Sequence, residues 1–204
     1  MSELTPARTA PARGRIATAA ITSAAFVALL WAVEIVDTVL GNRLDYYGIQ
    51  PREIDGLWGI LWAPLLHGGW QHLLANSGPA LVLSFVIVLS GLALWAEATA
   101  IIWVVAGVGT WLIAQPNSVH IGASSLIFGW ITFLVLRGVF ARSALQIVVG
   151  VLVLGAYGGV LWGVFPGQQG ISWQGHLFGA VGGVIAAVLL GRRARESAIP
   201  APRR

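Results

Sequence analysis

The sequence predicts an all-α membrane protein, a single bundle of six transmembrane helices, and three observations support this fold class. Of the 204 residues, 57% are hydrophobic and only 10% are charged, whereas a soluble domain carries roughly 25% charged residues. The mean hydropathy is +0.80. Six apolar segments each come close to the length of about 20 residues that a helix needs to cross a bilayer.

The first three apolar segments span approximately residues 16–40, 72–95 and 98–114. The first follows a basic start, but it is too long for the apolar part of a secretory signal, so we expect a retained span. The turn before the third is expected near Glu97. The connection between the first two contains Trp58 and Trp62, and tryptophan is typical of the membrane interface.

The last three apolar segments span approximately residues 124–140, 144–164 and 173–190. The fourth opens at Ser124, the fifth follows Arg142, and the sixth ends before Arg192. We therefore expect a tail of residues 1–15, a six-helix membrane domain of residues 16–191 and a second tail of residues 192–204.

The arginines predict how the bundle is oriented. They gather before the first span, around the turn between the fourth and fifth, and after the sixth, at Arg8, Arg13, Arg15, Arg137, Arg142, Arg192, Arg193 and Arg195. If the chain crosses the membrane six times, all three of these clusters lie on the same side. The positive-inside rule identifies that side as the cytoplasm. Both termini are thus expected in the cytoplasm, in a plasma or inner cell membrane, with the connections 41–71, 115–122 and 166–172 facing outward.

Composition excludes several kinds of function. The chain has no cysteine, which rules out disulfides, thiolate catalysis and cysteine-based zinc sites. Its pI of about 10.7 does not indicate a nucleic-acid partner, because the arginines lie in short clusters at the ends of apolar segments. The lipid bilayer is the partner that this composition predicts, and no cofactor is expected.

A serine and a histidine stand near the start of two different spans and predict a nucleophile–base pair. Ser124 lies 13 residues before Arg137, and His176 lies 16 residues before Arg192. At about 1.5 Å per residue, these separations are roughly 20 and 24 Å. Both side chains are therefore expected at a similar depth below the outer surface, where hydrolytic chemistry would take place inside the membrane.

Glycines and a second pair of polar residues extend this pattern. Gly175, Gly179 and Gly183 follow one another at four-residue intervals, a spacing that lets helix backbones touch in a membrane. His72 and Asn76 share a face of the second span, and both can donate hydrogen bonds to a developing oxyanion. Helix packing alone would also explain the glycines, and hydrogen bonds between helices would explain either polar residue.

These motifs resemble the rhomboid family of intramembrane serine proteases, and the resemblance covers about residues 16–191. It rests on His72-x-x-x-Asn76, on Gly122-x-Ser124, and on His176 with the glycines that follow it. The resemblance implies a water-filled cavity that opens outward, in which Ser124 is the nucleophile and His176 the general base. It further implies an oxyanion hole formed by His72, Asn76 and the Ser124 backbone N–H. The resemblance assigns supporting roles to Gly122, His67, Gly179 and Gly183. It also implies that the partners are transmembrane protein substrates, cut near their outer end.

Two positions depart from the family pattern. Ser125 stands where the family usually has glycine, and we expect it to modulate the site without abolishing it. Trp58-Gly59 stands where the family often has Trp-Arg, and Arg52 is the candidate replacement for that arginine.

Three other polar residues are expected to be structural. Glu34 and Asp37, near the outer end of the first span, are expected to anchor the first connection through Arg43 or Arg52. His120, four residues before Ser124, could line the cavity, but we expect it to be a loop residue that hydrogen-bonds backbone.

Two alternatives to a protease remain open at this stage. The four histidines could bind a transition metal or haem, since imidazole suits zinc, copper and iron, although no carboxylate cluster supports this. The chain could also be an inactive relative that binds membrane proteins, for which Ser125 is the only argument.

Overall fold

The computed structural model describes residues 12–168 and 170–197, and these residues form a helical bundle. The long helices are α1 (Ala12–Val39), α3 (Trp70–Ser90), α4 (Leu92–Ile113), α5 (Ser124–Ala141), α6 (Ala144–Tyr157) and α7 (Trp173–Ser197). The short ones are η1 (Leu44–Tyr47), η2 (Asp55–Leu57), α2 (Gly59–Trp62), η3 (Ala63–Leu65) and η4 (Gly158–Val164). The predicted tails lie largely outside the described residues.

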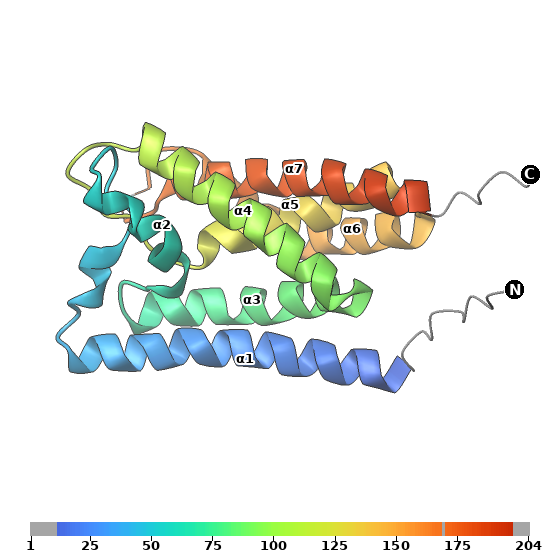
Figure 1. Cartoon of the computed structure of the whole chain (residues 1–204), viewed down its shortest axis with the longest axis horizontal. Helices are drawn as coiled ribbons and strands as arrows, with labels where there is room; N and C mark the ends of the chain where they lie inside the picture. The colour runs from blue at the N-terminus through green and yellow to red at the C-terminus, as the bar shows by residue number, and fades with distance from the viewer. Residues whose placement is uncertain (1–11, 169, 198–204) are drawn as a thin grey trace, which may run out of the picture.

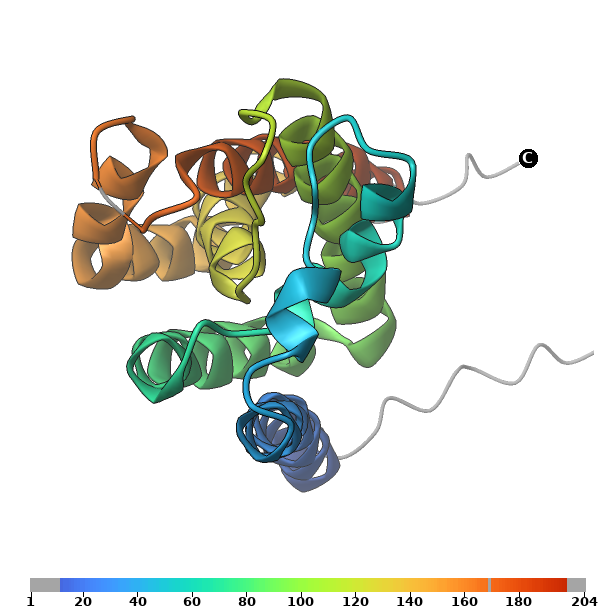
Figure 2. The same cartoon turned by 90° about the vertical axis from the view of Figure 1, so that its left-hand side faces the viewer.

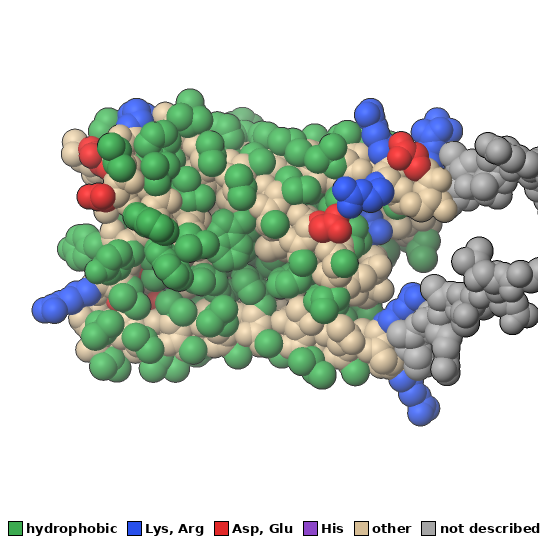
Figure 3. All heavy atoms as spheres, viewed as in Figure 1, with side chains coloured by type: hydrophobic (Ala, Val, Ile, Leu, Met, Phe, Trp, Pro, Cys, Tyr) green, Lys and Arg blue, Asp and Glu red, His purple; other side chains and the backbone are tan. Residues whose placement is uncertain are grey.

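In the part of the chain that the structure describes, six helical segments are long and apolar enough to cross a membrane, as the sequence predicts. Each predicted span corresponds to one of them, and the fifth combines α6 with η4 as Ala144–Val164. On the face shown in Figure 3, apolar side chains cover the length of the bundle, whereas charged ones gather towards its two ends. This is the distribution that a bilayer requires, because charged groups are costly in the hydrocarbon region.

The turn between the second and third spans lies at Gly91 and not near Glu97, which corrects the predicted boundary. Gly91 has φ +145° and ψ +136°, values that only glycine adopts readily, and it separates α3 from α4. Glu97 is instead inside α4, where its carboxylate accepts a hydrogen bond from Arg193 of α7 over 2.7 Å. The apolar residues on both sides of Gly91 hid the turn, because hydropathy does not change there.

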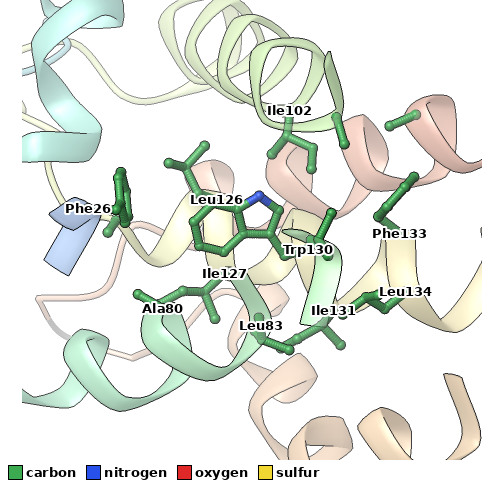
Figure 4. Close-up of a cluster of buried hydrophobic side chains, with 14 of the residues drawn as sticks. Phe26, Ala80, Leu83, Ile102, Leu126, Ile127, Trp130, Ile131, Phe133 and Leu134 are labelled. Atoms are coloured by element: carbon green, nitrogen blue, oxygen red, sulfur yellow. The ribbon is translucent and has the colours of Figure 1, made fainter. Parts of the chain in front are cut away.

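The helices pack around α5 (Figures 1 and 2). Helix α7 makes its most extensive contacts with α5 and then with α4, while α6 packs on α5 and α1 packs on α3. The buried cluster in Figure 4 lies between α5 and its neighbours. At its centre Trp130 donates a hydrogen bond to Thr99 over 3.0 Å and meets Phe26 edge to face at 5.6 Å.

The connections that join α1 to α3 and α4 to α5 gather at one end of the bundle, which we call the loop end. Helix α1 begins and α7 ends at the opposite end (Figure 1). The first connection (residues 40–69) carries η1, η2, α2 and η3, so it is structured as its length suggests. Ile49 and His120 exchange both backbone hydrogen bonds at 3.0 Å, which links the first connection to the second (residues 114–123).

The first connection is anchored to α1, but not through an arginine as the sequence suggested. The Asp37 carboxylate accepts a hydrogen bond from the Leu44 backbone N–H over 2.7 Å, because this N–H faces α1 at the start of η1. Arg52 instead donates to the Leu112 carbonyl oxygen over 2.9 Å at the end of α4. Burial, followed by repulsion from Asp37, raises the pKa of Asp45 to about 6.

Candidate active site

Ser124 is the first residue of α5, and the backbone before it is fixed by a glycine. Gly122 has φ +119°, and its N–H donates to the Ala63 carbonyl oxygen over 2.8 Å. A side chain at this position would place its Cβ 2.6 Å from Cε1 of His72. Only glycine therefore allows the loop to turn here against the His72 ring, and this turn presents the Ser124 hydroxyl to α7.

His176, in the first turns of α7, pairs with Ser124. Its Nε2 lies 2.9 Å from the Ser124 Oγ, and its Nδ1 lies 3.0 Å from the carbonyl oxygen of Gly163 in η4. A carbonyl oxygen can only accept, so Nδ1 carries the proton and Nε2 has a free lone pair. Nε2 then accepts the serine hydroxyl proton in the hydrogen bond, which is the arrangement in which a histidine can act as a base.

Phe128 holds the His176 ring in its plane, a role that the sequence analysis missed. The two rings are stacked with centroids 4.0 Å apart and an angle of 12° between their planes. Phe128 follows Ser124 by four residues and therefore lies on the same face of α5. His176 is only 8% exposed. The only sign of this role in the sequence is a phenylalanine four residues after a serine in an apolar helix, and such a spacing is too common to indicate a function.

Close contact between α5 and α7 brings the pair together. A Cβ at Gly179 would lie 2.9 Å from the carbonyl carbon of Ser125 and closer still to its oxygen. A Cβ at Gly183 would lie 2.9 Å from Cβ of Thr132. Both glycines thus lie directly against α5, as their spacing predicts.

His72 and Asn76 lie beside the pair, on α3. The Gly68 N–H donates to Nδ1 of His72 over 3.3 Å, so Nε2 of His72 carries a proton. This Nε2 faces the backbone at Gly122. One N–H of the Asn76 amide donates to the His72 carbonyl oxygen over 2.8 Å, which leaves its second N–H available.

A cleft of about 780 Å³ connects these groups. It is lined by residues of α3, the second connection, α5, η4 and α7, among them His72, Asn76, Ser124, Phe128, Gly163 and His176. In the view onto the loop end, α6 lies to the left of α5 and α3 lies below it (Figure 2). The site is thus a hollow between helices with a hydroxyl, a base and hydrogen-bond donors on its walls, which are the groups that acyl transfer requires.

Comparison with known proteins agrees with this geometry. Residues 55–193 match the rhomboid domain. The chain belongs to the rhomboid family. It is therefore a multi-pass membrane protein of an intramembrane protease family.

Several relatives share most of this rhomboid's length. It is 50% identical to uncharacterized proteins of Mycobacterium tuberculosis and Mycobacterium bovis over 201 residues, which cover 95% of this chain and 84% of theirs. It is 32% identical to rhomboid-like protease 5 of Toxoplasma gondii over 154 residues, which cover 71% of this chain and 16% of that protein. No solved structure matches the chain.

His67 supports the loop before Ser124 in this rhomboid. Its Nε2 accepts a hydrogen bond from the Ala123 N–H over 3.4 Å, and its ring meets the His72 ring edge to face at 5.1 Å. Burial, followed by the proximity of His72, lowers the pKa of His67 to about 4. His67 is therefore neutral near pH 7, as an acceptor must be.

His120 does not bond backbone through its side chain, contrary to the sequence-based expectation. Its Nδ1 lies 2.7 Å from the Ser172 hydroxyl and its Nε2 lies 2.9 Å from the Ser118 hydroxyl. The Ser172 hydroxyl in turn accepts from the Gly175 N–H over 3.3 Å. His120 therefore joins the second connection, four residues before Ser124, to Ser172 at the start of α7, four residues before His176.

The histidines of this rhomboid do not form a metal site in the structure. No group of three histidine or carboxylate side chains in residues 12–168 and 170–197 is arranged to hold a metal ion. His120 and His176 are each engaged with hydroxyl or carbonyl groups.

The Ser125 side chain lies near the site, with its Oγ 3.5 Å from the Gly122 carbonyl oxygen.

Proposed function

We propose that this rhomboid is a serine endopeptidase that cleaves membrane-spanning segments of other proteins through Ser124 and His176. The observation that carries the proposal is the hydrogen bond of 2.9 Å between Nε2 of His176 and Oγ of Ser124. It lies within the range of 2.6–3.2 Å over which a base abstracts a proton. Family membership supports the same class of activity.

The reaction follows from this geometry. Ser124 Oγ attacks the substrate carbonyl carbon while Nε2 of His176 takes the hydroxyl proton. The resulting tetrahedral intermediate collapses, the C–N bond breaks, and Nε2–H delivers its proton to the leaving amine. Water then attacks the acyl-Ser124 ester with His176 again as base, which releases the new carboxyl terminus and restores Ser124.

Three donors are the candidates for an oxyanion hole. Ser124 begins α5, so its backbone N–H has no acceptor one turn earlier in the helix, and the helix dipole favours negative charge there. His72 supplies its Nε2–H, and the Asn76 amide has one N–H that is not used within α3. A single such donor is worth about 2.7–4 kcal/mol in a site that excludes bulk water.

The substrate follows from where the cleft lies. The pair is located near the loop end of helices that span the membrane, and the arginine pattern assigns the loop end to the extracytoplasmic side of the cell membrane. The substrate would be a transmembrane segment cut near its outer end. An intact helix keeps its carbonyls in hydrogen bonds, so we expect a preference for glycine, proline or other helix-weakening residues near the cut.

The test combines covalent labelling with cleavage. Purified protein in detergent and in vesicles is treated with a fluorophosphonate probe and with a transmembrane substrate that contains a Gly-Pro site. Wild type and Ser90→Ala, which changes an exposed serine at the far end of α3, should label and cleave. Ser124→Ala and His176→Ala should do neither. Cleavage by Ser124→Ala would refute the proposal. Binding of substrate by an unreactive wild type would indicate a non-proteolytic relative.

A further inference from the structure

The outer half of the fifth span is the most loosely held wall of the cleft. Among the six spans found in the described residues, the 18-residue apolar stretch within Ala144–Val164 has the smallest buried share, and no residue of η4 is buried. Their last seven residues form η4, a 3₁₀-helix that includes Gly158, Gly159 and Gly163. Hydrogen bonds in a 3₁₀-helix have poorer geometry than those in an α-helix, and each glycine adds backbone freedom. Trp162 is 70% exposed, so η4 is the wall that moves with least loss of packing.

Helix η4 also provides the hydrogen-bond acceptor for His176, the proposed base. Within the described residues, the hydrogen-bond partner of His176 Nδ1 is the Gly163 carbonyl oxygen, at 3.0 Å. No described carboxylate forms an ion pair with this histidine. The choice between the two tautomers of His176 therefore depends on a backbone group of η4, because a histidine proton is placed by the hydrogen bond that the other nitrogen makes.

The absence of a side chain at residue 163 lets η4 come this close. A Cβ there would lie 2.9 Å from Cζ of Phe128 and 3.0 Å from Nδ1 of His176. Both rings are already stacked against each other at 4.0 Å, so neither can turn aside freely. Any side chain would push η4 away from α5 and α7 and lengthen the hydrogen bond to His176.

We propose that the Gly163 carbonyl is the positioning group for His176, so that the Ser124–His176 pair is competent only while η4 is docked on the bundle. The inference rests on the proposed function. A substrate helix that entered by displacing η4 would remove the acceptor from Nδ1. Proton transfer from Ser124 would then wait until η4 returned over the substrate, which separates entry from cleavage.

The decisive comparison is between two glycine-to-alanine variants of the same span. Gly163→Ala introduces the clash described above, whereas Gly155→Ala on α6 is the matched control, since a Cβ there meets nothing within 4 Å. We expect Gly163→Ala to lower kcat and the rate of fluorophosphonate labelling about 100-fold, the scale of a misoriented catalytic group, with little change in KM. Gly155→Ala should match wild type. If η4 were only a barrier, Gly163→Ala would instead be as fast as wild type or faster, which would overturn the inference.

A second measurement does not depend on activity. The chain has four histidines, so ¹⁵N NMR of histidine-labelled protein can be assigned with a His176→Gln variant. We expect the Nδ1–H tautomer at His176 in wild type and Gly155→Ala, and a mixture of tautomers in Gly163→Ala. An Nε2–H tautomer in wild type would refute the role of Gly163. An inactive wild type with the expected tautomer would refute the proposed function alone.

Discussion

Replacing Gly179 with alanine should separate the candidate pair by forcing α7 away from α5. The new Cβ would lie 2.9 Å from the Ser125 carbonyl carbon, whereas an ordinary contact begins at 3.4 Å, so the backbones must part by at least 0.5 Å. Both partners are main chain and cannot rotate aside. The distance from Ser124 Oγ to His176 Nε2 would then grow from 2.9 Å to about 3.4 Å or more, beyond the reach of efficient proton transfer.

We expect this change to lower fluorophosphonate labelling about 10- to 100-fold and to cost about 1–3 kcal/mol of stability, as overpacking usually does. Labelling rates and thermal unfolding in detergent would be measured for wild type, Gly179→Ala and Gly78→Ala. The last is the control, since a Cβ at Gly78 on α3 meets nothing within 4 Å. A Gly179→Ala protein with wild-type labelling and stability would show that α5 and α7 do not set the geometry of the pair.

Three further predictions concern charge. His67 should make the free energy of unfolding fall as the pH drops from about 6.5 towards 4, because His67 binds a proton in the unfolded chain over this range but not when its ring is buried. The whole shift of the His67 pKa is worth on the order of 3 kcal/mol. Denaturant titrations at several pH values should show a weaker pH dependence for His67→Gln than for wild type. Asp37→Ala should cost about 1–3 kcal/mol by leaving the Leu44 N–H unpaired, while Asp37→Asn should keep that bond and bring the Asp45 pKa down towards its usual range, which NMR titration would report. Glu97→Gln should change the unfolding free energy by less than about 1 kcal/mol, because the Arg193–Glu97 pair is exposed, and a larger loss would contradict this account.

Much of the fold could be predicted because bilayer thickness fixes the length of a span. The six spans and the proximity of Ser124 and His176 follow from hydropathy, spacing and a family resemblance. The turn at Gly91 could not be predicted, since glycine is also frequent inside membrane helices. Its backbone conformation, which sequence does not display, is what ends α3.

The rest of the site was hidden for a different reason. Phe128 acts through the flat face of its ring, which any apolar helix can offer at that spacing. Gly163 contributes a carbonyl oxygen, a group that every residue has, so no residue type identifies it. The anchor of the first connection is likewise a backbone N–H, which is why the arginine partners expected for Asp37 were wrong.

The bridge between Ile49 and His120 makes the loop end a cooperative unit. The first connection, the second connection and the start of α7 are joined through the Ile49 backbone, the His120 side chain and the Ser172 hydroxyl. Segments joined in this way tend to open together. The amide protons of Ile49 and His120 should therefore exchange with solvent at one common rate, set by the opening of the whole loop end. A substrate would then meet a rigid set of connections at the loop end and the loosely packed η4 at the side of the cleft.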